Sequence, residues 1–378
     1  MTFNELYKQI TENRQNSIQG YKNCIPFQHL SRLKPILPGI IKGEYYLITG
    51  NSGSAKSKLA RTLFINDPYV YVKSHPELDI KLDILYWPLE EGEDKIYSTE
   101  LSRMIKNKYN IVSSYRQLRS IGEQIQDNVY ELLPSLENEF NEWKEHIHVF
   151  GGRESNPFGI YKAARDFCYK HGRFYNHKGE SFTDEMMDDM LNSKGDWFKD
   201  IAGFRFNHPR HYVIIMVDHI SLIKTEGALN LTQSIYKLST EYLLALKNLF
   251  GCIPVIVQQQ NSKKEEQKYT SSGSSIEEKL EPSLDALADC TTTQREATVA
   301  FGIFAPNRYD ITEHNGYDIT ILKDHYRSLS LLKQRDDRAN VKLPLFFQGE
   351  SDYFNEMPRL DEKDKLNKVY EYAKTLKR

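Results

Sequence analysis

Short apolar runs separated by segments with helical spacing are the dominant pattern of this sequence. Continuous apolar runs of this length are typical of strands that are buried on both faces of a parallel sheet. Between them, apolar residues recur three and four positions apart, as in Leu231–Phe250. The alternation predicts an α/β fold with a mostly parallel central sheet flanked by helices. The predicted strands are Tyr45–Thr49, Leu82–Trp87, His211–Val217, Ile253–Val257 and Thr298–Phe304.

The rest of the chain is predicted to surround this core. A short N-terminal helix, Phe3–Asn13, has apolar residues on one face and must dock on its own domain or on a neighbouring subunit. Near the C-terminus, Leu329–Ala339 and Val341–Phe347 form a hairpin. The predicted organisation is an N-terminal helix and linker at 1–28, a core domain at 29–355 with helices and an insertion at 109–211, and a C-terminal helix at 356–378.

Two helices and a strand are predicted within the region 109–211. The helical patterns cover Tyr115–Asp127 and Tyr161–Lys170, and the strand covers His146–Phe150. Charged and aromatic residues then fill Asn176–Arg210. We assign no function to this region from the sequence.

Composition excludes several classes of protein. With 50 basic and 52 acidic residues among 378, the chain has no global field that attracts nucleic acid, so such binding requires a local basic patch. The four cysteines are scattered and include no C-x-x-C pair, which argues against a zinc site or a disulfide framework. The N-terminus lacks the apolar core of a signal peptide, and no apolar run approaches membrane-spanning length. We therefore expect a cytoplasmic protein without a membrane partner.

The segment that follows the first predicted strand has the layout of a phosphate-binding P-loop. Strand, glycine-bearing turn, Lys-Ser and helix occur in that order. Backbone N–H groups at the start of a helix bind phosphate oxygens, Lys56 would contact the β- and γ-phosphates, and Ser57 would bind Mg²⁺. Ala55 stands where the motif has its second glycine, which costs about 1 kcal/mol if that position has a positive φ. The predicted loop is Gly50, Asn51, Ser52, Gly53, Ser54, Ala55, Lys56 and Ser57.

Carboxylates follow two of the other predicted strands. In open α/β sheets, functional groups collect at the carboxyl ends of the strands. Glu90 follows Leu82–Trp87 and is the candidate general base for the water that attacks the γ-phosphate, with Glu91 as the alternative. Asp218 ends the strand at 211–217 and is the candidate Walker B carboxylate that holds Mg²⁺.

Three glutamines end the strand Ile253–Val257. A glutamine at this position could sense the γ-phosphate and pass its state to the following loop, Ser262–Glu281. The loop carries Lys263, Lys264 and Lys268, but acidic residues offset them, so it is a weak candidate for DNA contact.

Taken together, these stretches resemble the ATPase domain of DnaB-like replicative helicases over roughly residues 30–355, and the order of the motifs carries the resemblance. The resemblance implies a RecA-type fold, with Glu90 as catalytic base. It points to Gln260 as the γ-phosphate sensor, with Gln259 as the alternate. Leu332–Arg335 resembles the Lys-x-Arg motif, so Arg335 would be an arginine finger for the neighbouring subunit and Lys333 its companion. Asp336 and Asp337 replace the glycine that often follows.

The resemblance implies an ATP- and Mg²⁺-dependent helicase or translocase that acts on single-stranded DNA as a hexameric ring in replication. Primase or a helicase loader would be further partners, although the 28 residues before the core are too few for the family's primase-binding domain. The compact set of motifs is typical of a phage-encoded member, which would act in the cytoplasm of a bacterial host. Two alternatives stay open: a RecA- or RadA-type recombination ATPase, and a nucleotide-regulated assembly protein with little turnover.

Overall fold

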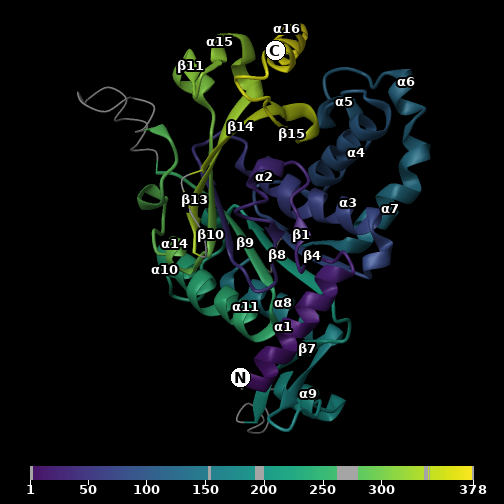
Figure 1. Ribbon diagram of the computed structural model, residues 1–378, viewed down its shortest axis with the longest axis vertical. Helices are drawn as coiled ribbons and strands as arrows, with labels where there is room; N and C mark the ends of the chain where they lie inside the picture. The colour runs from purple at the N-terminus through teal and green to yellow at the C-terminus, as the bar shows by residue number, and fades with distance from the viewer. Residues whose placement is uncertain are drawn as a thin grey trace.

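One large sheet organises the protein. The computed structural model describes residues 3–151, 155–191, 200–261, 280–335, 339 and 341–376. Within them, nine strands form this sheet in the order β15-β14-β13-β10-β3-β9-β8-β4-β5 (Figure 1). Neighbouring strands from β10 to β5 are parallel, and β13, β14 and β15 are added antiparallel at one edge. The strands are β3 Tyr46–Gly50, β4 Lys81–Pro88, β5 Ile147–Val149, β8 His211–Asp218, β9 Ile253–Gln259, β10 Val299–Phe304, β13 Tyr326–Gln334, β14 Val341–Gln348 and β15 Tyr353–Glu356.

Helices cover both faces of the sheet, so the mostly parallel α/β sheet that the sequence predicts is confirmed. Successive residues of β3 belong to opposite cores: Tyr46 and Ile48 to one, Tyr45 and Leu47 to the other. This explains why the strands are apolar throughout rather than alternating. One face is covered by α2 (Lys56–Arg61), α3 (Asp67–Ser74), α4 (Glu93–Tyr109) and α7 (Glu137–His146), and the other by α8 (Pro157–His171), α10 (Leu231–Tyr236) and α11 (Leu244–Phe250).

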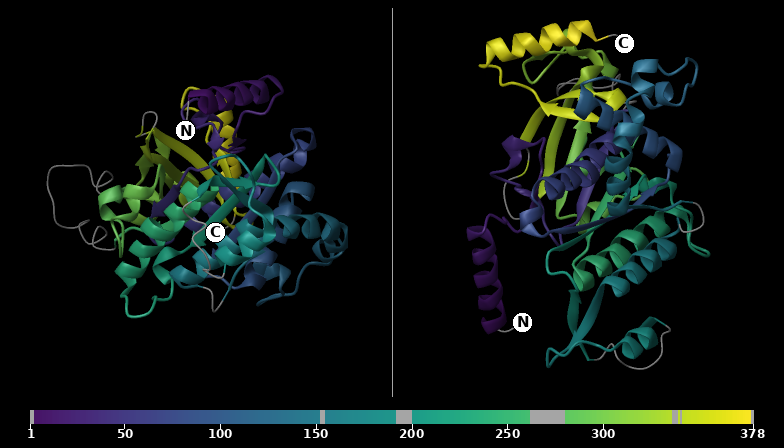
Figure 2. Two further views of the ribbon diagram at one scale, coloured as in Figure 1. Left: turned by 90° about the horizontal axis from the view of Figure 1, so that it is seen from below. Right: turned by 90° about the vertical axis from the view of Figure 1, so that its right-hand side faces the viewer.

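Smaller elements surround the sheet. The hairpin β6–β7 and helix α9 lie at the end of the molecule opposite to the C-terminal helix α16 (Figure 2). Helix α16 is not isolated, because Leu366 and Ala373 are buried against a small core around Tyr326 and Phe346. The elements are α1 Phe3–Ile18, β1 Ile25–Pro26, β2 Gly39–Ile40, α5 Tyr115–Leu118, α6 Asp127–Tyr130, β6 Gly172–Asn176, α9 Asp184–Leu191, β7 Ile201–Phe206, α14 Thr293–Glu296, β11 Glu313–His314, β12 Tyr317–Asp318, α15 Ile319–Leu322 and α16 Lys363–Thr375. Within the described residues, no helix has both the length and the apolar composition to cross a membrane.

The helix predicted over Tyr115–Asp127 is wrong. Only its first turn, α5, is helical, and the next helix begins at Asp127. The backbone at Ser120 and Gly122 has φ values of 51° and 89°, which no right-handed helix accommodates. The first helix, in contrast, runs past its predicted end at Asn13 to Ile18 and stops before Gly20, where φ is 89°.

A buried carboxylate joins three strands at the end of the sheet where β4 and β8 begin. His148 Nε2 of β5 lies 2.8 Å from Asp83 Oδ1 of β4, and His211 Nε2 of β8 lies 2.7 Å from Asp83 Oδ2. Burial alone would raise the pKa of Asp83, but hydrogen bonds from the two imidazoles outweigh it and hold that pKa below its usual range. The ionised carboxylate therefore stabilises the fold, and this contribution is lost only as the pH falls through the lowered pKa.

We expect Asp83→Asn to lower the free energy of unfolding by about 2–4 kcal/mol, because the amide leaves one imidazole N–H facing another donor. Urea denaturation at pH 7 measures this difference. Asp94→Asn is the control, since the Asp94 carboxylate is 80% exposed in its ion pair with Arg119 and should change stability by less than about 1 kcal/mol. Equal urea midpoints for the Asp83 variant and the unchanged protein would contradict the role of this carboxylate.

Candidate active site

The predicted P-loop joins β3 to α2 at the carboxyl edge of the sheet. β3 ends at Gly50 and α2 begins at Lys56. The helix continues through a wide π turn, Thr62–Asn66, into α3, and its start is open toward the loop. Strand, tight loop and helix start therefore have the geometry that places backbone N–H groups around an anion.

Ala55 has the left-handed backbone that was the condition for strain. Its φ is 77° and its ψ 31°, immediately before α2. Gly53 also has a positive φ, 68°, and a Cβ there would lie 1.5 Å from Nη1 of Arg308. The loop thus needs a glycine at 53 for two reasons, whereas at Ala55 it accepts a methyl group at a cost of about 1 kcal/mol.

Lys56 is buried at the loop and bends back over it. Its Nζ donates to the Asn51 carbonyl at 3.2 Å, and the Asn51 amide donates to the Tyr309 hydroxyl at 2.6 Å. Burial lowers the pKa of Lys56, while Asp218 and Glu90 oppose that change. An anion at the loop would restore the ammonium's preference for its charged form.

Ser57 and Asp218 meet across two elements that are distant in sequence. The Ser57 hydroxyl donates to Asp218 Oδ1 at 2.8 Å, and the Tyr86 hydroxyl lies 3.3 Å from Oδ2. Burial raises the pKa of Asp218 to about 6, although Arg61 and the Ser57 hydrogen bond counteract it. A converging hydroxyl and carboxylate fit Mg²⁺, which uses few protein ligands and keeps waters and phosphate oxygens. In keeping with this, no cluster of three His, Cys, Asp or Glu side chains that could hold a metal occurs within the described ranges.

The two candidate bases have different surroundings. Glu91 contacts Arg61 at 2.6 Å and Lys95 at 2.5 Å, and although burial opposes it, these cations lower the pKa of Glu91. Glu90 is exposed and lines the cavity next to the P-loop, close enough to Lys56 to affect its pKa. Of the two, Glu90 is the carboxylate that faces the position of a γ-phosphate.

The three glutamines of β9 point to alternate faces. The Gln260 amide donates to Thr49 Oγ1 at 2.8 Å and to the Ser283 carbonyl at 2.9 Å, and Gln258 holds the Ala288 and Cys290 carbonyls. Gln259 lies between them in sequence and lines the cavity, whereas Gln260 does not. The structure thus brings Gln259, the alternate, to the P-loop. Residues 262–279, which include Lys263, Lys264 and Lys268, lie outside the described residues.

Lys333 and Arg335 lie far from the P-loop of their own chain. Ile303 of β10 pairs with both Gly50 and Leu329, whereas Val299 pairs with Tyr46 and Gln334. Because β13 is antiparallel, its end is level with the start of β3, about 15–20 Å from the loop at ~3.3 Å per residue. There Lys333 Nζ donates to the Gln294 carbonyl, and exposed Arg335 donates to the Arg295 carbonyl, both at 2.5 Å. Asp336 and Asp337 lie outside the described residues.

Sequence reasoning missed several cations around the loop. Buried Arg327, at the start of β13, donates to the Ser54 carbonyl at 3.0 Å and lies 4.5 Å above the Phe347 ring. Buried Arg61 binds Asp352 Oδ2 through Nε and Nη2 at 2.9 and 2.7 Å. Neither belongs to a motif, and their partners are hundreds of residues away, so the sequence offers no means of finding them. His219 also lines the cavity, and its place directly after Asp218 is a clue that sequence reasoning did not use.

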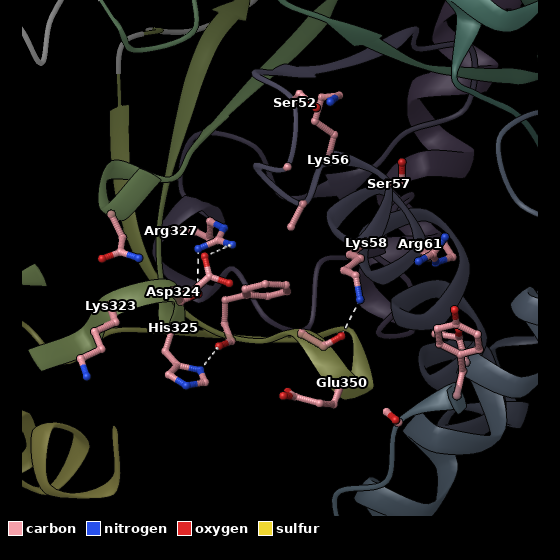
Figure 3. A pocket seen from close by; sticks show the side chains of 18 of the residues that line it. Ser52, Lys56, Ser57, Lys58, Arg61, Lys323, Asp324, His325, Arg327 and Glu350 are labelled. Carbon is pink, nitrogen blue, oxygen red and sulfur yellow. Dashed lines mark hydrogen bonds and ion pairs between the residues drawn. The ribbon is translucent and has the colours of Figure 1, made fainter. Parts of the chain in front are cut away.

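A cavity of about 1100 Å³ joins these residues. Figure 3 shows the P-loop side chains Ser52, Lys56 and Ser57 on one side and Lys323, Asp324 and His325 on the other. The cavity is large enough for a nucleotide, with its triphosphate at the P-loop and its base toward the antiparallel strands.

We expect Ala55→Gly to raise the free energy of unfolding by up to about 1 kcal/mol, because glycine adopts the positive φ without strain. Gly53→Ala is the matched comparison, and it should destabilise the protein since the new methyl group meets both an unfavourable φ and Arg308. Urea denaturation compares the two variants. A loss of stability in Ala55→Gly would contradict the left-handed geometry of the loop.

The comparisons with known proteins concern the fold. No protein-family model matches the sequence, and no curated protein matches it. Among solved structures, the chain is similar to the ATPase domain of a helicase, with a TM-score of 0.62 and 13% identity over 94% of this chain and 99% of that one. It is also similar to a DnaB-like replicative helicase described with its interactions with primase, with a TM-score of 0.57, 13% identity, and coverage of 88% of this chain and 63% of that one. At such low identity these likenesses establish architecture, and the chain has the RecA-like ATPase fold found in replicative helicases.

Proposed function

We propose that the protein is an ATP-driven helicase or translocase that acts on single-stranded DNA as a ring-shaped oligomer, a hexamer by the resemblance to DnaB-like helicases. The observation that carries this proposal is the division of the site. Lys56, Ser57, Glu90 and Asp218 converge on one cleft, whereas Arg335 lies at the opposite end of the sheet. An arginine finger in that position cannot reach its own cleft, so it requires a second subunit.

Helix α1 supports an oligomer. Its residues Phe3, Tyr7 and Ile10 are 78%, 62% and 55% exposed, and the helix stands away from the body of the protein (Figure 2). The alternative that its apolar face docks on its own domain is therefore not what the structure has. An unpartnered apolar face of this kind fits a neighbouring copy of the chain.

Each residue of the cleft has a distinct part in the proposed hydrolysis. Ser57 and Asp218 would hold Mg²⁺, which supplies positive charge to the β- and γ-phosphate oxygens when it is bound with ATP. Lys56 contacts the same phosphates from the P-loop. Glu90 takes the proton of the attacking water, and Arg335 of a neighbouring subunit stabilises the charge that develops on the γ-phosphate, with Lys333 beside it.

Gln259 is our candidate γ-phosphate sensor in place of Gln260. It faces the cleft, while Gln258 and Gln260 on the other face of β9 hold the segment 283–290. A shift of the strand end that follows loss of the γ-phosphate would therefore move that segment. We infer that this is how hydrolysis is coupled to DNA.

The biological setting follows from the likeness to helicases and from the chemistry of the chain. The four cysteines are free and buried, which fits a reducing cytoplasm. We propose a role in DNA replication in the cytoplasm of a bacterial host, with a primase or a loader as partner, since one structurally similar helicase is described with primase.

We expect steady-state ATP hydrolysis to rise when single-stranded DNA is added and to fall by at least about 10²-fold in Lys56→Ala, because the P-loop loses its phosphate cation. Lys170→Ala is the control, since Lys170 is an exposed lysine of α8 outside the cavity. Hydrolysis that is near zero in all three proteins, at concentrations that support oligomers, would favour the regulatory ATP-binding alternative. Electron microscopy with single-stranded DNA separates rings from the filaments of a recombinase.

We expect Arg335→Ala to lower turnover by about 10³-fold while nucleotide binding survives, because the finger acts on the transition state. Mixing it with Glu90→Gln should restore about one quarter of the activity, since one interface in four then combines an intact Glu90 with an intact Arg335. Mixing it with the double variant Glu90→Gln/Arg335→Ala is the control, as no complete interface can form. If the first mixture is as inactive as the control, Arg335 is not a finger in trans.

A further inference from the structure

His219 is a buried polar side chain of the cleft to which the helicase resemblance gives no task. It follows Asp218 at the end of β8, and only 6% of it is exposed. The side chain lines the cavity of about 1100 Å³ and also a second cavity of about 410 Å³ on the other side. Glu90 and Gln259 line both cavities as well, so these three side chains form the wall between them.

The tautomer of His219 is fixed by its neighbour in sequence. Its Nδ1 accepts a hydrogen bond from the Ser221 backbone N–H at 3.3 Å, where the chain begins a 3-10 turn, Ile220–Leu222. A ring nitrogen that accepts has no proton, so the neutral imidazole has its proton on Nε2. This contact also fixes the orientation of the ring, because the imidazole serves as the cap of the turn.

The Nε2–H group is a donor without a hydrogen bond of normal geometry among the described residues. Buried donors without a partner are rare in folded proteins, and in a cleft they indicate a ligand atom that completes the set. The charged and polar groups that face the ring are Lys56 and Glu90 from the cleft, Gln259 from β9, and Asp289 from the loop beyond β9. The donor thus lies among the residues that surround the γ-phosphate in the proposed function.

We propose that His219 is a further catalytic residue, whose Nε2–H donates to a γ-phosphate oxygen of the bound nucleoside triphosphate. This inference rests on the proposed function. A neutral donor stabilises the charge on the transferring phosphoryl group without adding a further cation beside Lys56. Because a nucleoside diphosphate lacks the γ-phosphate oxygens, His219 also distinguishes the triphosphate from the diphosphate.

Two substitutions separate this task from the capping of the turn. In His219→Asn, Oδ1 takes the place of Nδ1 and preserves the cap, but the amide N–H does not reach the position of Nε2. In His219→Gln, the amide N–H reaches that position, but the acceptor for Ser221 is lost. A structural role therefore predicts that Asn is the tolerated residue, and a donor to phosphate predicts that Gln is.

The experiment measures ATP turnover and the binding of a non-hydrolysable ATP analogue and of ADP, each with Mg²⁺, for the unchanged protein and both variants. We expect His219→Asn to lower kcat by about 10²-fold and to weaken the analogue about 10-fold with ADP affinity unchanged. His219→Gln should retain kcat within about 10-fold of the unchanged protein.

The opposite ranking of the two variants, or an equal loss of analogue and ADP binding in His219→Asn, would overturn this inference and leave the proposed function intact. Unchanged kcat and analogue binding in His219→Asn would overturn it too. If the unchanged protein binds neither nucleotide, both the proposed function and the inference fail.

Discussion

The register of the parallel strands is the constraint on which the whole site depends. Gly50 pairs with Gln259, Asp218 pairs with Val257, and Pro88 pairs with Asp218. Backbone hydrogen bonds thus hold the ends of β3, β9, β8 and β4 at one edge of the sheet. Since the strands are buried on both faces, a slip by one residue would turn every apolar side chain toward the wrong core. The apolar packing therefore fixes the relative positions of the P-loop, the Walker B carboxylate and the sensor strand.

Buried charges link this edge to the antiparallel part of the sheet. Arg61 of α2 binds Asp352, which follows β14, and Glu91, which follows Glu90. Its guanidinium also faces Asp218 and opposes the rise in that residue's pKa that burial causes. A buried cation of this kind is costly unless each of its donors is paired. The pairing ties the loop of the candidate base to the P-loop helix, so the base and the phosphate site move as one unit.

The two faces of β9 divide sensing from structure. Gln258 and Gln260 are buried and use their amides to hold the segment 283–290, whereas Gln259 turns toward the cleft. The period of two along a strand makes this division unavoidable, because neighbouring residues face opposite sides. The sequence Gln-Gln-Gln conceals it, since the three residues are chemically identical and only the pairing of β9 in the sheet assigns a face to each.

The local order of residues was enough to determine the α/β class, the strands of the core, the P-loop and the carboxylates Glu90 and Asp218, because strand periodicity and loop chemistry depend on neighbours in the chain. The same reasoning placed a helix at Tyr115–Asp127 that left-handed residues interrupt, and it chose Gln260 where the sheet presents Gln259. Contacts such as Arg327 with Ser54 and Arg61 with Asp352 join residues 273 and 291 positions apart. Only the tertiary structure decided them, and the separation of Arg335 from its own cleft, because long-range pairing is set by the packing of the whole sheet rather than by any local pattern.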